Sequence, residues 1–238
     1  MDESQTDTAG RTKAVDAPRA RNAGTGPARS PVAALTAILV GAVCGLAWAS
    51  AFRAWMAELA GGASRLDWYA TFVGILGAGV IAGALLGLAE YFRRTGGRRH
   101  WRWLALAPLA FAILPMTMPD ALLALFTQGL GGGAVAVALT AIAGGFAVSG
   151  RGALWARIAC GILALAVIVA LVFTTSAVGG VRLALDQPRG AWVATLGAAC
   201  VAVLCLASSS PFRRVEALAD PLGDAAIERD TSADAKNR

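Results

Sequence analysis

Few side chains in this sequence could do chemistry, and the acid Glu90 is the most prominent of them. It stands near the end of an apolar stretch, with Arg93 and Arg94 three and four residues further on. Side chains at these spacings lie on one helix face, so local ion pairs are expected. Glu90 also follows Gly87 by three residues, on the face expected to point toward protein. The pattern predicts either a local ion pair at the membrane interface or a charge that locks helices at a gate.

A second group of charges borders the first apolar stretches. Arg53, Glu58, Arg65 and Asp67 gather between the first two stretches, and Asp120 follows the third. Arg53 and Glu58 are five residues apart and do not share a helix face. These charges predict either a solvated, balanced loop or an outward-facing surface for a ligand or partner. Asp120 predicts a helix N-terminus at the interface, with a site as the alternative.

Glycines form the third pattern. Gly79, Gly83 and Gly87 recur at intervals of four residues, and Gly41 and Gly45 repeat this spacing. Such glycines form a flat stripe on which another helix can approach closely. We expect the stripe to pack within the bundle, or alternatively to form the seam of a homodimer.

Signatures of catalysis and cofactor binding are missing from the sequence. His100 is the only histidine, so two axial haem ligands cannot be assembled, and neither HExxH nor a P-loop motif occurs. The four cysteines lie in apolar stretches without a CxxC motif and are predicted to be small buried hydrophobes. No acid lies at mid-depth for a proton or sodium relay. We therefore expect no catalytic residue, no metal ion and no cofactor.

The elements that must position these residues are apolar. Of the 238 residues, 57% are hydrophobic and 15% are charged, whereas a soluble domain averages about 25% charged residues. Six apolar stretches have roughly 16–24 residues each, and about 20 residues cross a hydrocarbon core. The prediction is an all-α, polytopic transmembrane bundle over residues 32–210, between disordered polar tails at 1–31 and 211–238. The predicted spans are about 32–51, 68–91, 103–118, 130–149, 154–174 and 191–208.

Three local features refine these spans. Aromatic residues continue at helical spacing past the first span, so its helix is predicted to reach Leu59 and to stop at Gly61. Pro108 and Pro115 predict a kink in the third span. Residues 119–133 are expected either to lie in the interface as a short helix or to form a shallow re-entrant turn.

The distribution of charge predicts the orientation. Of the 21 Lys and Arg residues, 17 lie in the tails and in the loops after the second and fourth spans. The positive-inside rule therefore places both termini in the cytoplasm. Basic residues beside spans contact anionic headgroups, so we expect the lipid bilayer as a partner and no nucleic acid. Abundant Arg, Ala and Gly are typical of a GC-rich bacterial genome, so a bacterial cytoplasmic membrane is the expected location.

One short segment resembles a known family. Gly87-Leu88-Ala89-Glu90 followed by Gly96-Gly97-Arg98-Arg99 resembles the loop between helices two and three of major facilitator transporters. In both, a glycine, an acid, a second glycine and paired basic residues follow one another at a cytoplasmic position. The resemblance implies a conformational-latch role for Glu90. More residues separate the acid from the second glycine here, and six spans are half the number that the family has.

The leading functional hypothesis is a non-enzymatic integral membrane protein, an accessory or scaffold subunit of an envelope or transport assembly. One alternative is a small membrane transporter, single or dimeric. Another is a lipid-modifying enzyme that uses the outer charges near Arg53 and Asp120. A polar cluster at mid-depth would favour transport, and an outward cleft joining Arg53, Asp67 and Asp120 would favour the enzyme. A filled core with neither would favour the accessory subunit, whose partners are other membrane proteins or a second copy.

Overall fold

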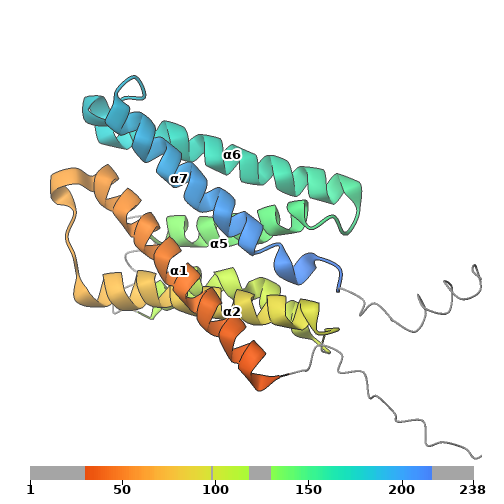
Figure 1. Ribbon diagram of the computed structural model, residues 1–238. Coiled ribbons are helices and arrows are strands. Elements are labelled where there is room, and N and C mark those ends of the chain that lie inside the picture. Colours follow the sequence, from red (N-terminus) through yellow and green to blue (C-terminus); the bar gives the residue numbers. More distant parts are fainter. Residues whose placement is uncertain (1–29, 98, 118–129, 216–238) are drawn as a thin grey trace, which may run out of the picture.

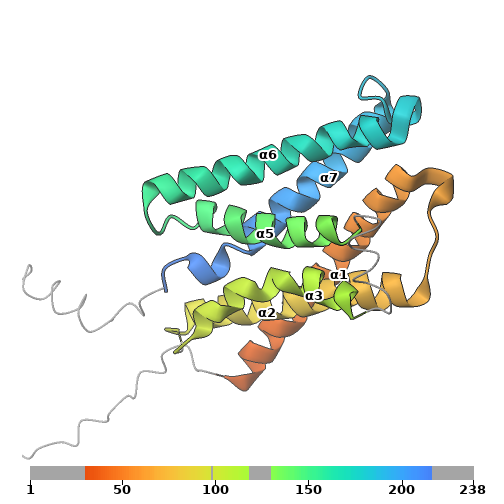
Figure 2. The same ribbon diagram turned by 180° about the vertical axis from the view of Figure 1, so that it is seen from behind.

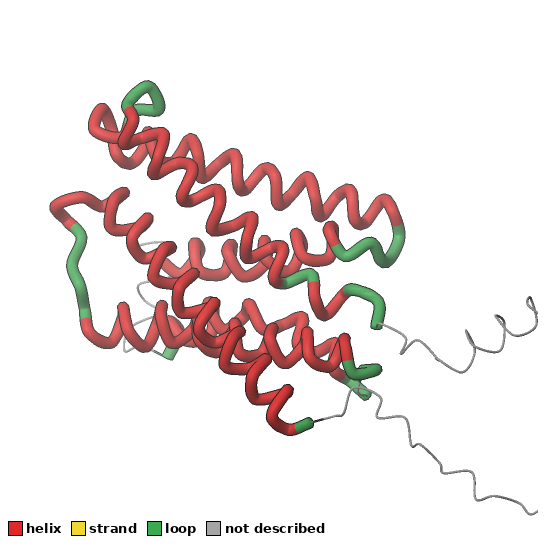
Figure 3. Tube along the Cα trace, in the orientation of Figure 1, coloured by secondary structure: helices red, strands yellow, loops and turns green. Residues whose placement is uncertain are grey.

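The fold is a bundle of helices that run side by side and alternate in direction along the chain (Figures 1 and 3). The computed structural model describes residues 30–97, 99–117 and 130–215. In this part of the chain 85% of the residues are helical and none is in a strand. The all-α prediction is confirmed. Most of both polar tails, Asp120 and most of the segment 119–133 lie outside the described residues.

In the described part of the chain, four helices are long and apolar enough to cross a membrane, as expected of a membrane protein. They are α1 (Pro31–Ala60) with the 3-10 turn η1 (Gly61–Ala63), the π-helix η2 (Tyr69–Gly77) with α2 (Ala78–Arg94), α6 (Leu154–Gly179) with η4 (Gly180–Leu183), and α7 (Pro188–Ala207) with η5 (Ser210–Phe212). Two shorter apolar helices lie beside them. These are the 3-10 helix η3 (Trp101–Leu109) with α3 (Ala110–Met116), and α5 (Leu130–Val148).

Local sequence explains the limits of α1. Pro31 occupies the first helical position, where the missing N–H would have no helical partner. The helix ends at Ala60 because Gly61 adopts a positive φ of 55°, which side-chain-bearing residues rarely do. The predicted continuation of this helix to Leu59 and its stop at Gly61 are confirmed.

Two helical segments depart from regular α-geometry. The kink predicted from Pro108 and Pro115 takes the form of a change from the 3-10 helix η3, which contains Pro108, to the α-helix α3, which contains Pro115. The nine-residue π-helix η2 at the start of the second apolar segment was not predicted. π-Helices are rare and usually occupy a single turn, often at functional sites. No pattern in this stretch of sequence predicts a π-helix.

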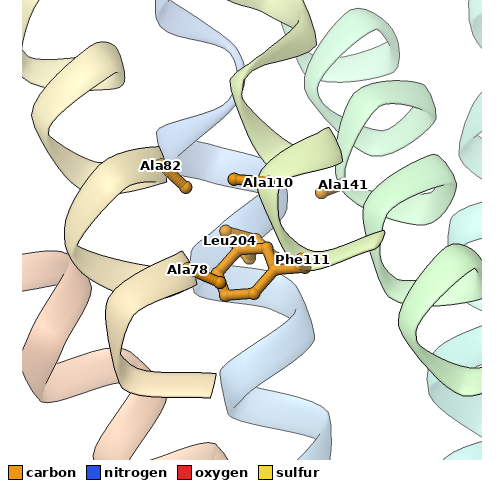
Figure 4. Packing of buried hydrophobic residues seen from close by; sticks show 6 residues of the cluster. All are labelled: Ala78, Ala82, Ala110, Phe111, Ala141 and Leu204. Atoms are coloured by element: carbon orange, nitrogen blue, oxygen red, sulfur yellow. The ribbon is translucent and has the colours of Figure 1, made fainter. Parts of the chain in front are cut away.

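The centre of the bundle is built mainly from small side chains. One buried cluster joins α2, α3, α5 and α7 (Figure 4). Its members are Ala78, Ala82, Ala110, Phe111, Ala141 and Leu204. Small residues allow helix backbones to approach closely, which is how helices associate when lipid removes most of the hydrophobic driving force.

Large apolar side chains cover the outside of α1 and α6. Val43 on α1 is 65% exposed, and Ile162 and Phe173 on α6 are 64% and 62% exposed. A face of this kind would be costly in water, whereas hydrocarbon chains solvate it well. The exposed surface therefore agrees with helices that lie in a membrane.

Candidate functional site

The glycine stripe of α2 is covered by α1 of the same chain. A Cβ atom added to Gly45 would lie 3.0 Å from the Cα atom of Gly83, and one added to Gly87 would lie 3.2 Å from the Cα atom of Gly41. A Cβ atom on Gly79 would also meet the side chain of Ala49. Backbone therefore contacts backbone along this seam, so any larger side chain would push the two helices apart. With α1 on it, the stripe is not open to a second copy of the chain.

Glu90 forms its ion pairs with its own helix. The Arg93 side chain donates to both carboxylate oxygens, at 2.8 Å from Nε to Oε2 and 2.7 Å from Nη2 to Oε1. Arg94 donates from Nε to Oε1 at 2.6 Å. The carboxylate side chain is 27% exposed, and those of Arg93 and Arg94 are 12% and 66% exposed. This is the arrangement expected of the local ion pair, at the end of α2.

The charges between the first two apolar segments have separate local roles. Arg53 donates from Nη2 to the carbonyl oxygen of Arg65 at 2.8 Å and contacts the Ser64 hydroxyl at 3.4 Å. It thereby holds the loop against the last turns of α1. Asp67 accepts the backbone N–H of Ala70 at 2.7 Å and caps the first turn of η2. These contacts do not bring Arg53 and Asp67 into a common cleft.

Glu58 has partners that sequence reasoning missed. Its Oε2 accepts from Arg189, at 2.8 Å from Nη2 and 3.0 Å from Nε, and lies 3.9 Å from Nη1 of Arg182. Arg182 also donates from Nη2 to the backbone carbonyl of Glu58 at 2.7 Å. A cavity of about 390 Å³ opens beside these three residues. The only sequence signal was topological, since the predicted spans put the three residues on one side of the membrane.

The described arginines divide between the two ends of the bundle. We call the end where α2 and α5 finish and α6 begins the basic end; it lies to the right in Figure 1. Its described arginines are Arg93, Arg94, Arg99, Arg102, Arg151, Arg157, Arg213 and Arg214. Glu90 is its only acid in the described part of the chain. The opposite end has Arg53, Arg65, Arg182 and Arg189, and it also has Glu58, Asp67 and Asp186.

Polar groups inside the bundle bind mainly to backbone. Trp48 donates from Nε1 to the carbonyl of Cys200 at 2.7 Å, and the buried Thr175 hydroxyl donates to the carbonyl of Leu171 at 3.0 Å. Cys205 lies 3.5 Å from the carbonyl of Thr140. Within the described residues, no three His, Cys, Asp or Glu side chains are grouped so that they could hold a metal ion.

An apolar cavity of about 440 Å³ lies between α1, η2, α3, α5 and α6. Its walls include Phe52 and Met56 of α1, Gly74 of the π-helix, Phe111 of α3 and Leu171 of α6. The cavity size is within the range of about 300–1,000 Å³ typical of small-molecule sites. Sequence reasoning could not find it, because five separate segments each supply a few ordinary apolar residues.

Trp55 also borders this cavity. Its indole packs on α7, where Gly197 leaves the space, because a Cβ atom there would lie 2.8 Å from Cε2 of the ring. The Trp55 Nε1 atom is buried without a hydrogen-bond partner in the described structure. A buried indole N–H usually has a partner. Nε1 is the ring atom nearest to that Cβ position, so this unpartnered donor faces Gly197 of α7.

The structure thus brings together some of the predicted residues and separates others. It joins the five stripe glycines into one seam and gathers Glu90 with its two arginines, whereas Arg53, Glu58 and Asp67 have different partners. Arg65 contributes its carbonyl oxygen, and Asp120 lies outside the described residues. Comparisons of the chain with protein-family models, with curated proteins and with solved structures find no match.

Proposed function

We propose that this chain is a six-span protein of the bacterial cytoplasmic membrane that acts as a non-enzymatic accessory or scaffold subunit of a membrane assembly. The proposal rests on the contacts that the carboxylates make in the described structure. Glu58 connects α1 to η4 and α7, Asp67 caps η2, and Glu90 is held by two arginines of α2. Three of the four described carboxylates therefore support the ends of helices.

The six spans and the orientation are part of this proposal. The two shorter apolar helices, Trp101–Met116 and Gly133–Val148, follow one another in the chain, and each runs opposite to the helix before it (Figures 1 and 2). At 1.5 Å per residue Gly133–Val148 is somewhat short for a ~30 Å core, a mismatch that local thinning of the bilayer accommodates. Trp101–Met116 comes closer to that length because its 3-10 part rises about 2 Å per residue. The excess of arginine at the basic end supports a cytoplasmic position for that end and for both termini.

Reporter fusions test the orientation. Fusions after Arg99 and after Arg238 are expected to read as cytoplasmic, and fusions after Ser64 and after Gln187 as external. An external reading after Arg99 or Arg238 would overturn the six-span arrangement.

Site-specific photocrosslinking tests the scaffold role. A photoreactive amino acid at Val43 or Ile162 would face outward from α1 or α6, whereas the same probe at the buried Ala164 faces the bundle. A scaffold is expected to give a discrete protein adduct from at least one outward position and none from Ala164. If every outward position on α1 and α6 gives lipid adducts and no protein adduct, the chain has no protein partner on these faces.

The apolar cavity favours a second candidate function, a carrier for an apolar molecule. Val167 of α6 lines the cavity, whereas Val169 of the same helix is 44% exposed. Val167→Phe should fill the cavity and displace an apolar molecule that co-purifies with the wild type, and Val169→Phe should not. Mass spectrometry of the organic extract measures this, and a wild type without a co-purifying apolar molecule would remove the carrier candidate.

A further inference from the structure

The basic end of the bundle contains an open groove of about 680 Å³ between η3, α5 and η5. His100 and Arg102 line it where η3 begins, and both are exposed. Leu106, Ile142 and Phe212 supply apolar wall. Leu106 follows Arg102 by four residues, a rise of about 8 Å along a 3-10 helix. Ile142 lies six residues before the end of α5, about 9 Å deeper in the bundle.

The groove therefore changes from basic to apolar with depth. A phospholipid has the same sequence of chemistry, because its phosphate lies at the membrane surface and its acyl chains run inward. Trp103, also in the wall, is 69% exposed at the start of η3. Amphipathic tryptophan rings prefer the headgroup level, so this end of η3 has the composition of a headgroup contact.

The surrounding charge selects among phospholipids. Eight described arginines lie at the basic end, and its one described acid, Glu90, is already paired with Arg93 and Arg94. Arg102 lines the groove, and Arg213 directly follows Phe212 of its wall. Basic pockets between membrane helices attract anionic headgroups, whereas a zwitterionic lipid brings a cation of its own into the same field.

We propose that this groove binds one anionic phospholipid, with the phosphate beside Arg102 and His100 and one acyl chain against Leu106, Ile142 and Phe212. The site requires helices that lie in a membrane. It does not require the accessory role proposed above, or a particular side of the membrane for the basic end. A lipid held here would connect η3, α5 and η5, three segments that are distant in the sequence.

Lipid titration followed by native mass spectrometry tests this site. The full-length chain in a neutral detergent is titrated with phosphatidylglycerol and, in parallel, with phosphatidylcholine of the same acyl chains. We expect one phosphatidylglycerol to bind in clear preference to phosphatidylcholine. Arg102→Gln should weaken that binding about fivefold, because a basic residue near the surface contributes about 1 kcal/mol to such binding.

Two further variants separate a built site from general attraction. Arg151→Gln removes the same charge from an exposed arginine at the same end that does not line the groove, and it should leave the affinity nearly unchanged. Leu106→Trp fills the apolar part without a change of charge and should also weaken binding. Melting curves show whether each variant is folded. Arg102 and Arg151 are both exposed, so replacing either one should leave the fold intact.

Three results would overturn the proposal. Equal losses from Arg102→Gln and Arg151→Gln would mean diffuse attraction and no site. If Arg102→Gln and Leu106→Trp both bind phosphatidylglycerol with wild-type affinity, the lipid binds elsewhere. Full competition by inorganic phosphate would mean that the groove recognises a free anion and not a lipid.

Discussion

The indole nitrogen of Trp48 donates a 2.7 Å hydrogen bond to the backbone carbonyl of Cys200, which joins α1 to α7 near the middle of both helices. The same indole stacks on Phe52, with ring centroids 5.1 Å apart, and contacts Phe111 of α3 at 4.9 Å. One side chain of α1 therefore contacts two other helices of the bundle. The glycine seam brings α1 against α2, and Trp48 brings it against α7.

Trp48→Phe should destabilise the bundle, since it keeps an aromatic ring and removes the donor. The lost hydrogen bond and the smaller ring should together lower the free energy of unfolding by about 1–2 kcal/mol. Thermal unfolding in a mild detergent measures the change. Trp68→Phe is the matched control, because Trp68 is 75% exposed, and an equal shift in both variants would contradict the role of Trp48.

Gly83→Leu should separate α1 from α2. Even a Cβ atom on Gly83 would meet the backbone of Gly41 and lie 2.9 Å from the Cα atom of Gly45. Overpacking of a close interface costs typically about 1–3 kcal/mol, and rigid backbone on both sides puts this position at the upper part of that range. Ile81→Leu, on the exposed side of α2, serves as the control in the same melting experiment. If both variants melt at the wild-type temperature, the seam is not the close contact described above.

Glu90→Gln should be nearly silent. The two ion pairs that it removes are local, at spacings of three and four residues, and pairs of this kind contribute about 0.3–0.5 kcal/mol each. The part of the loss that comes from Arg94, whose side chain is 66% exposed, should diminish in high salt, because exposed charges are screened. Unfolding across a salt series measures it. A large loss that persists in salt would instead support the interhelical gate, and with it the latch role that the resemblance to major facilitator transporters implies.

Glu58→Gln should cost more than Glu90→Gln, although both carboxylate side chains are 27% exposed. Glu58 connects α1 to Arg189 of α7 and Arg182 of η4, so its loss loosens contacts between helices. We expect a loss of about 1 kcal/mol, the upper part of the range for partly exposed pairs. Melting temperatures of the two variants in one buffer decide the order. If Glu90→Gln lowers the melting temperature more than Glu58→Gln, the hydrogen bonds from Arg182 to the backbone of α1 are enough to hold these helix ends together without the Glu58 carboxylate.

The helical class, the apolar segments and several helix limits followed from the sequence alone. These properties depend on interactions within a few residues of the chain, such as the conformational freedom of Gly61, the missing N–H groups of Pro108 and Pro115, and the spacing of Glu90 from Arg93. The stripe of Gly79, Gly83 and Gly87 was also visible, because its period of four is a local property of one helix.

Only the tertiary structure decided which elements meet. It set α1 on the glycine stripe, paired Glu58 with residues 124 and 131 positions away, and formed the apolar cavity between five segments. In a soluble helix, an apolar stripe beside a polar face shows which side is buried. Helices that lie in lipid are apolar on every side, so this signal disappears and the neighbours of each helix depend on close packing of small residues. Such packing is a property of two surfaces together, which is why the contacts between helices could not be read from one stretch of sequence at a time.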